Sequence, residues 1–286
     1  MQVAQQCDRL VEFMRQLESC LVAYSGGVDS AVVAKAAAVA LGPRAVAVTA
    51  VSASLATGEL AGACELAGVI GIRHEIIRTE ELARSGYAAN GFDRCYHCKT
   101  ELYSRLLPLQ EQLRFKTLVN GANVDDLSDY RPGLRAAAEY KVVSPLADLG
   151  LTKDDVRDLA RAWQLPVAEK LASPCLASRI AYGEEVTPDR LRMIDRAEQW
   201  LRERGHRDVR VRYHAGDLAR IEVPTGQLLK LAGLASDELP DAFQSFGFKY
   251  VTLDLQGRRS GSHNIVVPVD ALQQSATDAK RREEKF

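Results

Sequence analysis

The sequence predicts an α/β protein with a doubly wound parallel sheet and a smaller C-terminal α+β domain. Two observations carry this prediction. Short apolar runs, typical of buried parallel strands, alternate with segments of helical periodicity up to Tyr182-Gly183. Beyond that point the pattern changes to one long helical segment and short alternating strands. We therefore expect a sheet domain over 1–182, a smaller domain over 183–275 and a tail over 276–286.

In the first domain, strands are expected where apolar runs are short and end on small or polar residues. These runs cover 19–24, 45–51, 72–77 and 116–120. Segments with a helical spacing of apolar residues cover 3–19, 31–41, 57–67, 99–107 and 152–163. Thr152 is placed to cap the last of these helices. Ligands of such sheets bind at the carboxyl ends of the strands, which are therefore the candidate site.

The second domain is expected to hold a helix over 188–204 and strands over 209–213 and 219–223. In the first of these strands, apolar residues alternate with Arg210 and Arg212, so one face is apolar and the other cationic. The cationic face either binds a phosphate or carboxylates or is an ordinary solvated face.

Composition and charge exclude several classes of protein. The 286 residues carry a formal net charge of -1, so a role on nucleic acid would need a local basic patch. No apolar run approaches the roughly 20 residues that span a bilayer, and the first residues lack the apolar core of a signal peptide. We expect a cytoplasmic protein without a membrane partner, whose six cysteines serve ligation or catalysis rather than disulfides.

A glycine-rich loop joins the first strand to the next helix. It consists of Ser25, Gly26, Gly27, Val28, Asp29 and Ser30. The two glycines let the backbone approach a ligand, so that amides at the helix N-terminus and the two serine hydroxyls can hold an anion. The lysine of a Walker loop is missing, and the remaining groups suit pyrophosphate while the α-phosphate of ATP is attacked. A serine-glycine turn that binds nothing is the alternative.

A second polar loop follows the fourth strand and contains Gly121, Asn123, Asp125 and Asp126. Carboxylates beside a triphosphate would repel it unless Mg²⁺ intervened, so we expect an octahedral Mg²⁺ that is held partly by ATP. A helix cap and turn is the competing interpretation.

Three cysteines lie in expected loops. Cys95 and Cys98 form a CxxC pair before the helix over 99–107, and Cys175 lies in a later loop. Three thiolates at one site would suit a [4Fe-4S] cluster that has one iron without a protein ligand. A zinc or mixed site that uses His97, and thiols without a metal, stay open. The other cysteines are expected to be small buried hydrophobes: Cys7, Cys20 and Cys64.

Cys175 has the surroundings of a reactive thiol. Lys170 and Arg179 flank it with positive charge, and Pro174 keeps the chain before it out of a helix, so a thiolate would be exposed in an electropositive loop. A thiolate is a suitable nucleophile for an adenylated carboxylate. An ordinary loop cysteine is the alternative.

Five motifs occur in the order SGGVDS, RCYHCK, GANVDD, DYRPG and SPCLASRIAYG. In this order they resemble the LarE-type branch of the PP-loop superfamily, which has an adenine nucleotide alpha hydrolase-like fold. Enzymes of this branch insert sulfur when the nickel-pincer nucleotide cofactor of lactate racemase is made. The resemblance implies ATP-dependent conversion of the carboxylates of pyridinium-3,5-dicarboxylate mononucleotide to thiocarboxylates.

The resemblance also implies roles for single residues. The SGGVDS loop would grip pyrophosphate while a substrate carboxylate attacks the α-phosphate, and AMP would become the leaving group. Cys175 matches the position that attacks the acyl-adenylate, and Asp29 is the second candidate catalytic residue. The candidates for substrate binding are Arg179, Arg210 and Arg212, the last two for the phosphate of the substrate.

Members of the branch differ in their source of sulfur. Those with a lone cysteine at this position give up its sulfur and keep dehydroalanine, whereas those with an added CxxC resemble cluster-dependent enzymes. Cys95 and Cys98 place this chain with the second group, so the implied cofactors are ATP, Mg²⁺ and a [4Fe-4S] cluster. The implied partners are a small-molecule nucleotide substrate, further copies of the chain in a homo-oligomer, and transiently bound nickel-insertion or racemase proteins.

Three other functions stay open. A PP-loop enzyme that thiolates tRNA would need an RNA-binding surface, which the neutral charge does not supply. An amidating ligase of the NAD- or GMP-synthetase kind would need no cysteine. A nucleotide-sensing or metal-carrying module would release no pyrophosphate.

Overall fold

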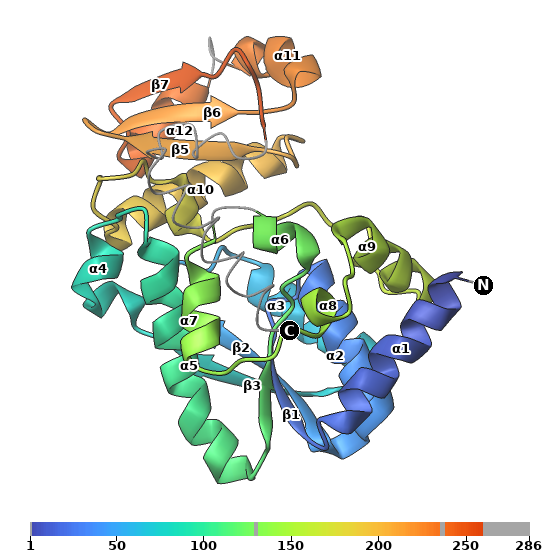
Figure 1. Ribbon diagram of the computed structural model, residues 1–286. Coiled ribbons are helices and arrows are strands. Elements are labelled where there is room, and N and C mark those ends of the chain that lie inside the picture. The colour runs from blue at the N-terminus through green and yellow to red at the C-terminus, as the bar shows by residue number, and fades with distance from the viewer. Residues whose placement is uncertain (1, 129–130, 235–237, 260–286) are drawn as a thin grey trace.

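A computed structural model describes residues 2–128, 131–234 and 238–259, and the expected tail over 276–286 lies outside these ranges. The first part is built on a four-stranded parallel sheet with the strand order β3-β2-β1-β4 (Figure 1). The strands are β1 (Cys20–Ala23), β2 (Ala45–Val51), β3 (Arg73–Arg78) and β4 (Thr117–Val119). Each strand coincides with a predicted apolar run, so these four predictions are confirmed.

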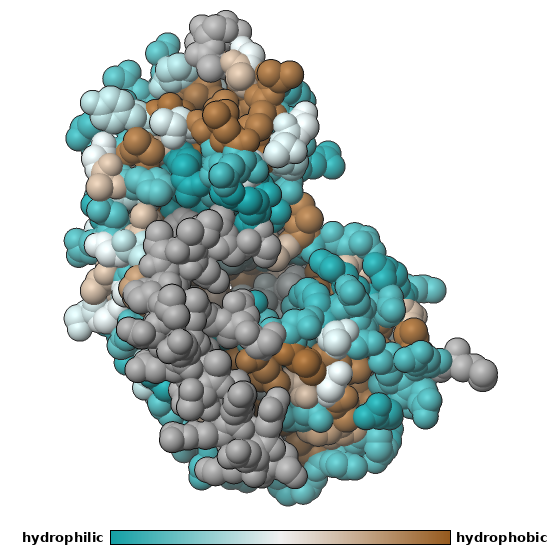
Figure 2. Space-filling model, turned by 45° about the horizontal axis from the view of Figure 1, so that its top comes forward, coloured by the Kyte–Doolittle hydropathy of each residue, from teal (hydrophilic) through white to brown (hydrophobic). Residues whose placement is uncertain are grey.

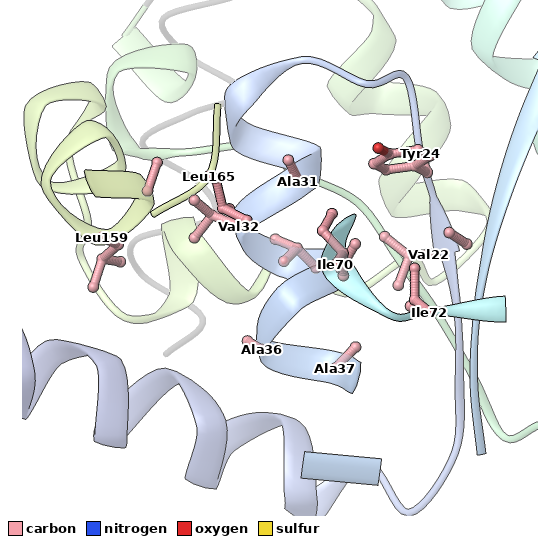
Figure 3. Close-up of a cluster of buried hydrophobic side chains, with 14 of the residues drawn as sticks. Val22, Tyr24, Ala31, Val32, Ala36, Ala37, Ile70, Ile72, Leu159 and Leu165 are labelled. Atoms are coloured by element: carbon pink, nitrogen blue, oxygen red, sulfur yellow. The ribbon is translucent and has the colours of Figure 1, made fainter. Parts of the chain in front are cut away.

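Helices cover both faces of this sheet. One face carries α1 (Gln2–Gln16), α2 (Val28–Leu41), α3 (Glu59–Ile70) and α9 (Lys153–Ala162). The other face carries α5 (Arg94–Leu113) and α7 (Gly133–Glu139). Figure 3 shows part of the first layer, in which Val22 and Tyr24 lie on one side of α2 and Leu159 lies on the other. The doubly wound sheet is therefore confirmed.

Side chains alternate along β1 as a strand between two layers requires. Cys20 and Val22 belong to the core beneath α1 and α2, whereas Leu21 belongs to the core beneath α5. All three are fully buried. Burying a valine or leucine side chain stabilises a fold by roughly 1.5–3 kcal/mol, so β1 is firmly held at the centre of the sheet. Its carboxyl end leads directly into the glycine-rich loop.

Short helices connect these layers. They are η1 (Gly42–Arg44), η2 (Glu81–Ala83), α4 (Ser85–Ala88), α6 (Val124–Ser128), α8 (Pro145–Asp148) and η3 (Leu176–Arg179). The predicted cap of α9 is confirmed, because the Thr152 hydroxyl accepts the Asp155 amide and the Asp155 carboxylate accepts the Thr152 amide. A cap of this kind stabilises a helix by about 1 kcal/mol, and it fixes the residue at which α9 begins.

The second part contains a three-stranded sheet of order β5-β6-β7, with β5 antiparallel and β7 parallel to β6. Its strands are β5 (Arg210–His214), β6 (Leu218–Glu222) and β7 (Tyr250–Leu253). Its helices are α10 (Pro188–Glu203), η4 (Thr225–Gln227), α11 (Leu228–Gly233) and α12 (Leu239–Phe246). The smaller α+β part is confirmed, including the predicted α10, β5 and β6.

The two parts share a core where they meet. Tyr87 and Leu176, which precede residue 183, pack with apolar side chains of α10, β5 and β6. Figure 1 shows α10 between the small sheet and the rest of the molecule. The boundary at 182/183 therefore stays a prediction, since apolar contacts run across it.

The surface shown in Figure 2 is mainly hydrophilic, with a group of apolar side chains on the smaller part. The exposed large apolar residues of that part include Leu229, Tyr250 and Leu255. No helix within residues 2–128, 131–234 and 238–259 combines the length and the apolar character that crossing a membrane requires.

Two predictions about cysteines are wrong. Cys95 and Cys98 lie in the first turns of α5 and not in a loop. The polar RCYHCK segment forms the first turns of α5, although it lacks the apolar spacing that predicts a helix from the sequence. Cys64 is an exposed residue of α3 and not a buried hydrophobe, whereas Cys7 and Cys20 are buried as predicted.

Candidate active site

A cavity of about 490 Å³ opens at the carboxyl ends of the parallel strands, where the sequence predicts a site. Its walls contain residues of three predicted groups. They are Ser25, Asp29 and Ser30 of the glycine-rich loop, Gly121 and Asp126 of the second loop, and the thiols of Cys95, Cys98 and Cys175. The cavity therefore joins the predicted ATP site to the three predicted sulfur residues.

The glycine-rich loop is closed by its own serines. Ser25 Oγ lies 3.2 Å from Ser30 Oγ, and the Ser30 hydroxyl donates to the Gly27 carbonyl over 3.1 Å. Gly26 has a φ of +72°, and a Cβ on it would lie 3.0 Å from Ala63 of α3, so only glycine fits here. α2 begins at Val28 immediately behind the loop. The positive end of the helix dipole thus lies at the cavity.

The second loop packs directly on the first. A Cβ on Gly121 would lie 2.7 Å from the amide nitrogen of Ser30, so this approach requires glycine. Asn123 joins the two loops by donating from Nδ2 to Asp29 Oδ1 over 3.0 Å. The two predicted loops therefore form one continuous wall.

Asp29 also pairs with a lysine that sequence analysis missed. Lys153 Nζ lies 2.5 Å from Asp29 Oδ2, and the Lys153 amide donates to Asp125 Oδ2 over 2.8 Å. Lys153 is the first residue of α9. The cap at Thr152 predicts where this helix begins, but nothing in the sequence says that this end lies beside the glycine-rich loop.

The expected Mg²⁺ finds oxygen donors here but no complete shell. Asp29 is paired with Lys153, and Asp126 pairs with Arg131 over 2.9 Å. Among the residues that the structure describes, no three or more His, Cys, Asp and Glu side chains are grouped to hold a metal ion. The donors fit Mg²⁺ in type, and phosphate oxygens of ATP would have to complete its coordination.

One face of α5 lines the cavity. Its residues there are Cys95, Cys98, Lys99, Leu102 and Tyr103, a spacing that places side chains on the same side of a helix. His97 is turned away from this face: its Nε2 lies 3.1 Å from Asp93 Oδ2, and its ring packs on Gly86 of α4. A site of mixed ligands that uses His97 together with the cysteines therefore finds no support in the arrangement of α5.

The three thiols lie within electrostatic reach of one another. The pKa of Cys98 is raised to about 12, first by burial and next by the negative charge of a Cys175 thiolate, with Cys95 contributing as well. A bound cationic centre would relieve this repulsion. Thiolates are the usual ligands of a [4Fe-4S] cluster, so the three thiols fit that cluster in type and number. Their spacing does not form a ready metal site, because the described residues contain no group of three or more His, Cys, Asp and Glu side chains placed to hold a metal ion.

Four arginines hold the loop over 172–178 that carries Cys175. Their guanidinium groups donate to its backbone carbonyls: Arg210 to Ala172, Arg179 to Pro174 and Cys175, Arg94 to Ala177, and Arg212 to Ser178. The Leu176 amide donates to the Ser54 carbonyl over 2.8 Å. The Cys175 side chain is therefore exposed on a loop whose backbone is held at many points.

Arg179 in turn is held by Glu198 of α10. Its Nε donates to Oε1 over 2.9 Å and its Nη2 to Oε2 over 3.2 Å, and both side chains are 0% exposed. Burial alone would raise the pKa of Glu198, but the charge and the hydrogen bonds of Arg179 hold that pKa below its usual value. The carboxylate is therefore ionised in the folded protein at neutral pH.

The ordinary solvated face that β5 could have presented is not observed. Arg210 and Arg212 are only 7% and 8% exposed, because their guanidinium groups turn toward the loop over 172–178. Burial, and then the charge of Arg179, lowers the pKa of Arg210 to about 10. The three arginines predicted to bind substrate, Arg179, Arg210 and Arg212, are not part of the cavity lining. They hold the Cys175 loop, and their binding of substrate stays a prediction.

No protein-family model matches the chain. The chain is 48% identical over 261 residues to an uncharacterized protein of Synechocystis sp., over 91% of this chain and 97% of that protein. It is 36% identical over 256 residues to the pyridinium-3,5-bisthiocarboxylic acid mononucleotide synthase of Lactiplantibacillus plantarum, over 89% of this chain and 92% of that enzyme. Identity to a component of the glutamine-hydrolyzing GMP synthase of Archaeoglobus fulgidus is 26% over 64% of each chain. The first two similarities cover both the parallel sheet and the smaller part.

Proposed function

Because this chain belongs to the LarE-type family of ATP-dependent sulfurtransferases, we propose that it converts the carboxylates of pyridinium-3,5-dicarboxylate mononucleotide to thiocarboxylates through an acyl-adenylate. The Lactiplantibacillus plantarum relative is named for a pyridinium-3,5-bisthiocarboxylic acid mononucleotide. The observation that carries the proposal is the cavity itself, which is lined both by the glycine-rich loop and by Cys95, Cys98 and Cys175. Activation and sulfur transfer can thus take place without release of an intermediate.

In the activating step, a carboxylate oxygen of the substrate attacks the α-phosphorus of ATP, and the bond to the bridging oxygen of the β-phosphate breaks. Negative charge develops on the pyrophosphate as it leaves, and the amides of the glycine-rich loop and the positive end of α2 would stabilise that charge. Lys153 adds a cation at the same place, since its ammonium already lies against Asp29. Mg²⁺ that arrives with ATP would meet the carboxylate of Asp29.

In the second step, sulfur attacks the acyl carbon, and the electron pair of the broken C–O bond leaves with AMP. Cys175 is exposed at the cavity for this role, and its loop is fixed by Arg94, Arg179 and the Ser54 carbonyl. In the cluster route Cys175 would instead be a ligand: Cys95, Cys98 and Cys175 would hold a [4Fe-4S] cluster that carries an extra sulfide as the attacking sulfur, so that no sulfur of the chain itself would be consumed.

The alternative source of sulfur is Cys175 itself. Its thiolate would displace AMP and form a thioester with the substrate. Removal of the α-proton of Cys175 would then break its Cβ–S bond, so that the substrate keeps the sulfur and the chain keeps dehydroalanine. This route lowers the mass of the protein by one H₂S, whereas supply by a cluster does not.

The deciding experiment isolates the protein without oxygen and measures iron, acid-labile sulfide, pyrophosphate release and intact mass before and after turnover. We expect pyrophosphate only when ATP and the pyridinium dicarboxylate are both present, together with bound iron and sulfide and an unchanged mass. A chain free of iron that loses the mass of one H₂S would establish the sacrificial route instead.

A pair of cysteine variants separates sulfur transfer from activation. Cys175→Ala should still release pyrophosphate but form no thiocarboxylate, whereas Cys64→Ala, at an exposed position on α3 outside the cavity lining, should keep both activities. Formation of an amide instead of a thiocarboxylate, by the wild type and by Cys175→Ala alike, would favour an amidating ligase. Tight tRNA binding that weakens steeply with salt would favour a tRNA thiolase.

A further inference from the structure

Glu81 is a buried carboxylate in the wall of the cavity that no step above uses. It lies in η2 and is only 4% exposed. One of its oxygens, Oε1, accepts a hydrogen bond from the Ser52 hydroxyl. Within the described residues, the other oxygen has no hydrogen-bond partner and the carboxylate has no ion pair; this oxygen is not among the fully buried atoms that lack a partner, so it is open to the cavity.

The other carboxylates that line this cavity are each neutralised by a cation. The pairs are Asp29 with Lys153 at 2.5 Å, Glu59 with Lys170 at 2.7 Å and Asp126 with Arg131 at 2.9 Å. Lys99 also lines the cavity, but none of its described contacts is an ion pair with Glu81. Among the described lining residues, Glu81 is thus the carboxylate left without a counter-charge.

Glu81 lies at the sulfur end of the cavity. The Ser52 hydroxyl that donates to Glu81 accepts the Ser54 amide, and the Ser54 carbonyl accepts the amide of Leu176, the residue after Cys175. The charge of Glu81 also contributes to raising the pKa of Cys98. Ser52 and Ser54 line the cavity beside it. A ligand that reaches the thiols therefore comes close to this carboxylate.

A buried carboxylate without a cation is costly, because the protein replaces water around the charge only in part. The fold supplies no cation to offset this cost at Glu81, although it supplies one to each of the three other carboxylates that line the cavity. The cost is offset if the ligand brings the positive charge. Resting on the function proposed above, we infer that Glu81 is the counter-charge for a cationic heteroaromatic ring, the pyridinium of the substrate.

This assignment makes Glu81 a residue that selects substrates by ring charge. The carboxylates of the substrate are acted on at the glycine-rich loop and at Cys175, and they would be repelled by Glu81. The ring nitrogen, in contrast, would be attracted to it. Glu81 would therefore favour the orientation that keeps the ring beside η2 and the reacting carboxylate away from it.

The test compares two probes that differ in ring charge and in one N-methyl group: 1-methylpyridinium-3,5-dicarboxylate, the ring of which is cationic, and pyridine-3,5-dicarboxylate, the ring of which is neutral at pH 8. Calorimetry measures their dissociation constants for the whole chain. We expect the wild type to bind the cationic probe about tenfold more tightly. Glu81→Gln keeps an acceptor for the Ser52 hydroxyl, and it should bind the two probes with about equal dissociation constants. Glu59→Gln removes a carboxylate that already has a cation, and it should keep the preference.

Thermal unfolding of the free protein adds a second measurement. Glu81→Gln removes a buried charge that has no counter-charge, so it should melt at or above the wild-type temperature. A clear loss of melting temperature, or failure to fold, would show a structural role and overturn the assignment. Equal binding of the two probes by the wild type, or an unchanged preference in Glu81→Gln, would overturn it as well. Failure of the wild type to bind either probe would also overturn the assignment, whereas the proposed function falls only if the complete pyridinium-3,5-dicarboxylate mononucleotide elicits no pyrophosphate release.

Discussion

Asp29 lies between a lysine and an asparagine that come from other parts of the chain. Lys153 Nζ contacts one carboxylate oxygen at 2.5 Å, and Asn123 Nδ2 donates to the other at 3.0 Å. A free carboxylate at this position would repel the phosphates of ATP. The ammonium of Lys153 removes that repulsion, and it can transfer its contact to pyrophosphate when Mg²⁺ takes the carboxylate.

Lys153→Met should therefore slow pyrophosphate release. Removal of one hydrogen-bond donor that stabilises the charge of a transition state typically costs on the order of 10²–10³ in kcat, and we expect a decrease of this size in substrate-dependent pyrophosphate formation. Lys116→Met is the matched control, because Lys116 pairs with Glu18 at an exposed position away from the cavity. A kcat for Lys153→Met within about twofold of that of the control would contradict the role assigned to Lys153.

At the scale of elements, the position of Cys175 depends on the start of α5. Arg94, the residue before Cys95, is 5% exposed and donates from Nη1 to the Ala177 carbonyl over 2.9 Å. Asn90 extends this connection by donating to the carbonyls of Ala181 and Glu184, each over 2.8 Å. The helix that carries the CxxC pair is thereby bonded to the segment that carries the third cysteine.

Arg94→Gln should loosen the Cys175 loop, whereas Arg94→Lys should restore part of its order. A hydrogen bond from a charged donor contributes about 1.5–3 kcal/mol, so its loss should speed local opening of the loop about tenfold or more. Hydrogen exchange at the Leu176 amide, which is bonded to Ser54, reports this opening. Arg84→Gln is the control: it removes an ion-pair partner of Glu101, which lies on α5 as Arg94 does, and it should leave exchange at the Leu176 amide unchanged. Equal exchange in both glutamine variants would rule out a positioning role for Arg94.

At the scale of the whole molecule, the sequence predicts the layers better than the contacts between them. Apolar periodicity is a local property, so the four parallel strands, α9 and α10 follow from it. The glycine-rich loop is predictable because its glycines are required by its own backbone and by close approaches. Lys153, Glu81 and Glu198 were missed because their roles depend on which distant segment they meet.

The cationic strand β5 shows the same limit. Alternation predicts correctly that Arg210 and Arg212 share a face, but a pattern along one strand cannot say what covers that face. The loop over 172–178 covers it here, and its backbone carbonyls take the donors that solvent or substrate would otherwise receive. Burial of these side chains is therefore a consequence of tertiary packing and not of the strand itself.

The buried pair of Arg179 and Glu198 joins the Cys175 loop to α10, so it should control the stability of the whole chain. Breaking such a pair typically costs about 3–5 kcal/mol, and we expect Glu198→Gln to lower the free energy of unfolding by about this amount at pH 7. The pKa of Glu198 is lowered in the folded state, from an ordinary value of 4.5. Its contribution is therefore fully present above about pH 4.5 and is lost as the pH falls through the folded pKa.

Urea unfolding from pH 7 to pH 3 measures this dependence. The difference in the free energy of unfolding between wild type and Glu198→Gln should be constant and should narrow only below about pH 4.5. Glu203→Gln, at an exposed position on the same helix, should stay within about 0.5 kcal/mol of the wild type. A gap that widens on acidification would mean that Glu198 is not the ionised partner of Arg179.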